Sequence, residues 1–124
     1  MRQAGIVKRV RGSGNSSSAI CECHWDFIPE ILRWFMENSD LVRPIDLTKF
    51  FTHKIYKQEI LSLMKDCLDS LNPFLPAKDK PIQSCSGVCD SYYYIRIGKA
   101  LDELREIIKS VDFDSWDVYY YERP

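Results

Sequence analysis

The stretch that decides the fold of this chain is residues 91–123, SYYYIRIGKALDELREIIKSVDFDSWDVYYYER. Its two tyrosine triplets, residues 92–94 and 119–121, each lie in a run of aromatic and β-branched residues, which favours β-strands. The apolar residues between the triplets recur at intervals of three, four and three: Leu101, Leu104, Ile108 and Val111. That spacing predicts an amphipathic helix, and Gly98 is a natural place for a strand to pass into it. The stretch therefore predicts a strand, a helix and a second strand.

The connection between the two predicted strands, residues 98–115, is long enough for a right-handed crossover, so a parallel arrangement of the strands is allowed. An all-helical alternative stays open, because Tyr94, Ile97 and Leu101 extend the apolar stripe backwards. That alternative places Gly98 inside a helix, at a cost of about 1 kcal/mol.

The rest of the chain supplies further elements. Residues 5–11 (GIVKRVR) and 19–25 (AICECHW) alternate and predict an N-terminal hairpin. Asp26 is a candidate cap for a helix with Pro29 in its first turn, and residues 46–71 look helical, as one helix or as two with a break near His53. We therefore expect an α+β fold, with a small sheet packed against three or four helices.

Length and composition bound the organisation of the chain. Its 124 residues suffice for one compact domain, and 45% hydrophobic and 13% aromatic residues suffice for a core. We expect residues 1–18 to be a basic head, either flexible or a first strand, and residues 19–124 to be a single domain. No apolar run is long enough to cross a bilayer, so we expect a soluble, cytoplasmic protein without a membrane partner.

Charge is unevenly distributed along the chain. Residues 1–18 hold four of the 17 basic residues and none of the 18 acidic ones, which leaves an acidic body behind a basic head. An acidic body argues against nucleic acid as the main ligand and for a basic partner.

The five cysteines are odd in number and accompany no secretory signal, which favours a reducing compartment. Four of them are weak candidates for a structural zinc site: Cys21, Cys23, Cys85 and Cys89. Their C-x-C and C-x3-C spacings differ from the usual zinc knuckle, and in a regular strand Cys21 and Cys23 point to the same face. We therefore expect free thiols and no cofactor, with a Cys85–Cys89 disulfide only in an oxidising environment.

Catalytic motifs are not apparent. His24 and His53 are the two histidines, and neither lies in a recognisable nucleophile or base motif. The GSGNS segment lacks the lysine and the strand-to-helix context of a phosphate loop. We therefore expect a protein that is not an enzyme.

The acidic, tyrosine-rich C-terminal end is the candidate binding surface. Alternation places Asp117, Tyr119 and Tyr121 on one face of the last strand, opposite Trp116, Val118 and Tyr120. If the two predicted strands are neighbours, tyrosines from both form one aromatic patch. The predicted partner-binding residues are Tyr92, Tyr94, Asp112, Asp114, Asp117, Tyr119, Tyr121 and Glu122. The competing interpretation is a tyrosine-rich sheet packed inside the domain.

These observations lead to two hypotheses of function. The first is a non-enzymatic protein-binding module whose acidic, tyrosine-rich face holds or neutralises a basic protein, such as a toxin or nuclease, as an inhibitor or immunity-type protein would. The alternative is a nucleic-acid-binding or structural-zinc accessory protein that acts through the basic head and the cysteines. Salt-sensitive binding of a protein favours the first, and stoichiometric zinc or nucleic-acid affinity that requires residues 1–18 favours the second.

Overall fold

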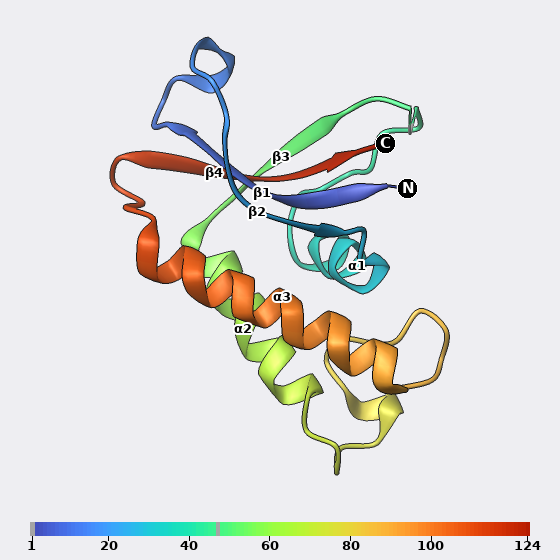
Figure 1. The fold of residues 1–124 in the computed structure, drawn as a ribbon. Helices are drawn as coiled ribbons and strands as arrows, with labels where there is room; N and C mark the ends of the chain where they lie inside the picture. The colour runs from blue at the N-terminus through green and yellow to red at the C-terminus, as the bar shows by residue number, and fades with distance from the viewer. Residues whose placement is uncertain (1, 47) are drawn as a thin grey trace.

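The computed structural model describes residues 2–46 and 48–124, which form a four-stranded antiparallel sheet and three α-helices (Figure 1). The elements in chain order are β1 (Gln3–Val10), β2 (Ile20–Asp26), α1 (Pro29–Asn38), β3 (Phe51–Ile55), α2 (Lys57–Ser70), α3 (Ser91–Ser110) and β4 (Trp116–Arg123). The strand order across the sheet is β2-β1-β4-β3. The predicted α+β fold class is confirmed, and so is the strand at the C-terminus.

The molecule has two layers. Figure 1 shows all three helices below the sheet, with α2 and α3 side by side. Alternate strand residues pack towards the helices and form the core with them: Ala4, Ile6, Cys23, Trp25, Ile55, Val118 and Tyr120. Within the described part of the chain, no helix covers the opposite face of the sheet.

The predicted N-terminal hairpin is confirmed, because β1 and β2 pair antiparallel. The pairing shifts between Ile6, which lies opposite Cys23, and Val7, which lies opposite Cys21. The adjacent residues Ile6 and Val7 point to opposite faces of the sheet. Because of the bulge, their partners Cys23 and Cys21 therefore also lie on opposite faces. Cys23 is buried and Cys21 is exposed, and the expectation that they share one face is wrong.

The first predicted C-terminal strand is wrong, because residues 91–97 are the first turns of α3. The Asp90 carboxylate accepts a hydrogen bond from the Tyr93 N–H at 3.0 Å and caps this helix. Tyr93 and Ile97 are both fully buried and lie four residues apart, so together they continue the apolar stripe backwards. Gly98 therefore lies inside the helix, where a Cβ would meet nothing within 4 Å. The all-helical alternative is therefore correct for residues 91–97 and wrong for residues 116–123, which form β4.

The parallel arrangement that a crossover would allow is not found. β4 pairs antiparallel with β1 on one side and with β3 on the other. β4 follows α3 after a short connection, residues 111–115.

The helix predicted over residues 46–71 is wrong in its first part. Residues 51–55 form β3, and α2 begins only at Lys57. The start of α2 is set by Glu59, whose carboxylate accepts from the Tyr56 N–H at 2.9 Å. Asp46, the predicted cap, instead accepts from the backbone N–H and the hydroxyl of Thr48 in a local turn.

The other predicted boundaries are close to the observed ones. Helix α1 begins at Pro29 as expected, but Ile28 is its cap residue, not Asp26. Between α2 and α3 the chain is irregular apart from a short 3-10 turn, Ala77–Asp79. This connection is held by the buried Lys80 ammonium, which donates to the carbonyl oxygens of Ser70 and Asn72 at 2.8 and 2.6 Å. None of the described helices has the length and apolar character that crossing a membrane requires.

Candidate interaction surface

The face of the sheet opposite the helices carries predicted partner-binding residues of the C-terminal stretch. We call it the open sheet face and define it by the residues that alternation directs away from the core on three strands: Gln3, Gly5, Val7, Arg9, Asp117, Tyr119, Tyr121, Arg123, Thr52 and Lys54. His24 and Cys21 extend it onto β2. The register places Tyr119 between Val7 and Lys54, and this row crosses the centre of the face.

Tyr121 lies on the open sheet face but is itself only 4% exposed. Its ring lies against Gly5, where a Cβ would come within 2.8 Å of the Tyr121 Cε1 atom. The Phe50 ring stacks against the Tyr121 ring, with centroids 5.8 Å apart. Burial, followed by the nearby Cys21 thiol, raises the pKa of Tyr121 to about 12. Tyr121 is thus part of the floor of this face, and the prediction of an exposed ring at this position is wrong.

Tyr119 is the predicted tyrosine that remains on the open sheet face with part of its surface in water. Three cationic side chains lie on the same face: Lys54 in the same row, Arg9 in the adjacent row and Arg123 at the far end. The Arg123 guanidinium donates to the side-chain oxygen of Gln3 across β1 and β4. The face therefore combines a tyrosine ring with positive charge.

Glu122 was predicted to bind a partner, but it points to the core side of the sheet and is fully buried. Its Oε1 atom lies 2.6 Å from the Arg2 Nε and 3.2 Å from the Arg43 Nη2, and its Oε2 accepts from the Tyr120 hydroxyl at 2.9 Å. Burial, and then the Glu122 charge, raise the pKa of Tyr120. This arrangement neutralises the carboxylate, so Glu122 cannot contribute to an acidic surface.

Asp112 and Asp114 are exposed, as predicted, and form the turn between α3 and β4. The Asp112 carboxylate accepts from the Asp114 N–H at 3.0 Å and from the Ser115 hydroxyl at 2.9 Å, which shapes that turn. Both carboxylate oxygens of Asp117 already have partners within the protein. Its Oδ2 accepts from the Gly12 N–H at 2.9 Å, and its Oδ1 lies 3.5 Å from the Lys54 ammonium. The predicted acidic cluster is thus reduced to two carboxylates at one end of the sheet.

Tyr92 and Tyr94 lie on the first turn of α3, and the helix runs its full length before the chain reaches β4 (Figure 1). Tyr92 is 71% exposed. Tyr94 packs edge-to-face on Tyr93, and the Lys80 ammonium lies 5.2 Å from the Tyr94 ring centroid. The condition for a single patch of Tyr92, Tyr94, Tyr119 and Tyr121 is therefore not met. That patch depended on two neighbouring strands, and one of those strands is a helix.

The cysteines are all free thiols, and they lie in separate parts of the fold. Cys21 and Cys23 are on β2, whereas Cys85 and Cys89 are in the connection before α3. In the described ranges, no three His, Cys, Asp or Glu side chains are grouped closely enough to hold a metal ion. Burial raises the pKa of Cys67 to about 12, so this thiol stays protonated and behaves as a core residue.

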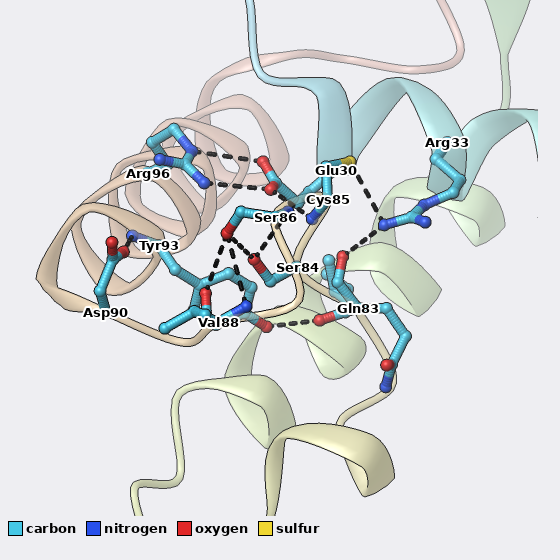
Figure 2. Close-up of polar contacts among 11 residues, drawn as sticks. Glu30, Arg33, Gln83, Ser84, Cys85, Ser86, Val88, Asp90, Tyr93 and Arg96 are labelled. Atoms are coloured by element: carbon cyan, nitrogen blue, oxygen red, sulfur yellow. Dashed lines mark hydrogen bonds and ion pairs between the residues drawn. The ribbon is translucent and has the colours of Figure 1, made fainter.

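Sequence reasoning missed a buried polar cluster around Glu30 on α1 (Figure 2). The Glu30 carboxylate accepts from the Arg96 guanidinium at 3.0 and 3.2 Å and from the Cys85 N–H at 3.0 Å. Burial alone would raise the pKa of Glu30, but these hydrogen bonds outweigh it and lower that pKa below its ordinary value. Burial and the Glu30 charge raise the pKa of the Cys85 thiol, which opposes formation of a nucleophilic thiolate.

The Glu30 cluster has a structural role. It connects α1, α3 and the irregular connection, and Arg33 adds a second link by donating to the Gln83 carbonyl oxygen at 2.7 Å (Figure 2). In the sequence, Glu30 looks like an ordinary acidic residue in the first turn of a helix. Its partner Arg96 is 66 residues away, and no local signal connects them.

Comparisons with known proteins do not add to this picture. No protein-family model matches the chain, and no curated protein or solved structure matches it.

Proposed function

We propose that this protein is a non-enzymatic protein-binding module that holds its partner on the open sheet face. The observation that carries the proposal is the partly exposed Tyr119, which shares with Arg9, Lys54 and Arg123 a sheet face that no described helix covers. Tyrosine and arginine are enriched in protein interfaces, because they offer large contact areas and directional hydrogen bonds. The strands beneath them give these side chains a rigid support.

Charge complementarity indicates an acidic contact surface on the partner. This face carries three cations, Arg9, Lys54 and Arg123. It also carries two carboxylates, Asp117 and, opposite Gln3 on β2, Asp26, so its net charge is about +1, and Lys54 and Asp117 pair with each other. This proposal reverses the sign that the sequence favoured, because Glu122 is buried between two arginines. Whether the bound partner is neutralised depends on which of its surfaces is covered, so the inhibitor or immunity-type role stays a prediction. A cytoplasmic location also stays a proposal and rests on the cysteine usage of the sequence.

A protein partner fits this face better than single-stranded nucleic acid does. Bases stack on aromatic rings whose faces are free, but the Tyr121 ring is covered by Phe50. Two cations of the basic head also have carboxylate partners, since Arg2 contacts Glu122 and Lys8 contacts Glu22 at 2.7 Å. Fewer charges are therefore available for phosphates than the sequence suggests.

The test is capture of binding proteins from a native lysate with the full chain as bait, repeated with charge-reversal variants. Lys54→Glu and Arg123→Glu alter the open sheet face, whereas Lys65→Glu and Lys109→Glu alter exposed lysines on α2 and α3. We expect one protein to be retained by wild type and by the helix variants, to be lost from the sheet-face variants, and to bind more weakly as salt rises.

Two results would contradict the proposal. The first is capture that the sheet-face variants keep and the helix variants lose. The second is capture that is lost in an Asp112→Lys, Asp114→Lys double variant and kept in the sheet-face variants, which would restore the basic partner predicted from the sequence. Nucleic acid recovered with the bait, and released by deletion of residues 1–18, would favour the alternative function.

A further inference from the structure

A cavity of about 220 Å³ lies at the end of the sheet, where β3 passes into α2 and α3 passes into β4. Three aromatic rings from these segments line it: Tyr56, Phe113 and Trp116. Ile55 and Val118, both buried, add aliphatic surface. One part of the cavity is therefore apolar and suited to a flat ring.

The other part of the cavity is cationic. Arg11 from the hairpin, Lys54 from β3 and Lys57 from α2 all line it, together with one carboxylate, Asp117. The lining side chains thus carry a net charge of about +2 by the ordinary protonation states of these groups. Segments far apart in the sequence bring these charges together, so the combination depends on the fold.

Lys54 pairs with Asp117, whereas Lys57 and Arg11 have only long or weak contacts within the protein. The Lys57 ammonium lies 5.7 Å from the Phe113 ring centroid, and the Lys54 ammonium lies 5.4 Å from the Tyr56 ring centroid and 3.5 Å from Asp117. The Arg11 guanidinium is 3.4 to 3.5 Å from the carbonyl oxygens of Phe113 and Asp114. It is also 3.9 Å from the Asp114 carboxylate, which is 99% exposed and does not line the cavity. A compact anion would give these groups stronger partners.

We propose that this cavity binds a phosphate monoester carried on an aromatic ring. The ring packs among Tyr56, Phe113 and Trp116, and the phosphate meets Arg11, Lys54 and Lys57. This inference does not rest on the proposed function of the open sheet face, although Lys54 borders both that face and the cavity.

Charge and size select this class of ligand. A phosphate monoester carries about −1.5 to −2 charges at pH 7, which matches the lining, whereas a sulfate ester or a carboxylate carries one. Typical pockets for drug-sized ligands measure roughly 300 to 1,000 Å³, so this cavity accommodates a single ring with its anion. Such a group occurs in free aryl phosphates and in the side chain of phosphotyrosine.

The test is a titration of the ¹⁵N-labelled full chain with phenyl phosphate, followed by NMR. We expect saturable shifts at residues 54–57 and 111–118, and tighter binding of phenyl phosphate than of phenyl sulfate, phenol or inorganic phosphate. Lys57→Ala should weaken binding about tenfold, the loss expected for one charge-assisted hydrogen bond. Lys65→Ala, a matched change on the exposed side of the same helix, should leave the dissociation constant unchanged. Arg11→Gln provides a second variant, since Arg11 is 60% exposed and its loss leaves the core intact.

The proposal is overturned if phenyl phosphate binds no better than phenol or phenyl sulfate, if the shifts lie elsewhere, or if Lys65→Ala weakens binding as much as Lys57→Ala does. A phosphotyrosine peptide and its unphosphorylated form distinguish the sources of the ligand. Tighter binding of the phosphorylated peptide than of phenyl phosphate assigns the cavity to a modified protein. Equal or weaker binding assigns it to a free aryl phosphate. The Arg123→Glu variant on the open sheet face should bind phenyl phosphate and the phosphotyrosine peptide with unchanged affinity, because the cavity acts independently of that face.

Discussion

Replacement of Glu122 by glutamine tests most directly how the C-terminal strand is used. A carboxylate that waits in water for a partner can be replaced at little cost to stability. Replacing a carboxylate that is buried between Arg2 and Arg43 destabilises the fold, because glutamine removes the charge and turns an amide N–H₂ towards a guanidinium group. The variant keeps the shape of the side chain, so the effect reports charge and hydrogen bonding.

The expected loss of unfolding free energy is about 3 kcal/mol. Two charge-assisted hydrogen bonds, at 2.6 and 3.2 Å, contribute roughly 1.5 to 3 kcal/mol each. The lower end of this range applies, because the side chains of Arg2 and Arg43 are 15% and 26% exposed and regain hydration when the carboxylate is removed. With a urea dependence of about 2 kcal/mol per molar, the unfolding midpoint should fall by about 1.5 M.

Urea unfolding followed by tryptophan fluorescence measures this loss. Asp114→Asn is the matched control, since its carboxylate is 99% exposed, and it should change stability by less than about 0.5 kcal/mol. Combining Glu122→Gln with Arg43→Met should cost less than the sum of the single changes, because the two groups interact. A Glu122→Gln protein as stable as the Asp114→Asn protein would refute the buried ion-pair cluster and return Glu122 to the surface.

Three further predictions follow from the packing and the pKa shifts. Gly5→Ala should lower the free energy of unfolding by about 2 kcal/mol, because its Cβ would stand 2.2 Å from the Cys23 carbonyl oxygen. Gly98→Ala should raise it by about 0.5 to 1 kcal/mol, because its Cβ would point into open space on α3. Thermal unfolding compares the two variants, and equal effects would contradict the register around Gly5. The folded pKa of Glu30 lies below its ordinary value of 4.5, so its stabilisation is present above pH 4.5 and is lost as pH falls through the folded pKa. Glu30→Gln should therefore be less stable than wild type at pH 7, with a difference that shrinks below pH 4.5 in urea titrations; a constant difference would argue against the ion pair. Maleimide labelling followed by peptide mass spectrometry should modify exposed Cys85 well before buried Cys67, and the opposite order would contradict the placement of α2.

The sequence alone determined the features that depend on local periodicity. The hairpin and β4 follow from residues that alternate along the chain, and the apolar stripe of α3 follows from helical spacing; both patterns reflect which side chains share a face. The α+β class follows from them. The inward direction of Val118 and Tyr120 also follows from alternation, and the structure confirms it.

Tertiary structure decided where local preferences conflict with burial. The run at Tyr93 favours a strand by composition, but the helix buries both Tyr93 and Ile97 against the core and is capped by Asp90. Residues 51–55 could continue a helix, but β4 presents an edge for them to pair with. Sequence patterns cannot weigh such alternatives, because the competing partners are distant in the chain.

The candidate site shows the same division. Alternation places Glu122 on the same face as Tyr120, yet its charge suggests exposure, and only the folded chain shows which tendency prevails. Arg2 and Arg43, which are 120 and 79 residues away, approach Glu122 and compensate its buried charge. Periodicity is a local property that the sequence displays directly. The pairing of buried charges depends on distances in space, which only the assembled sheet and its connections determine.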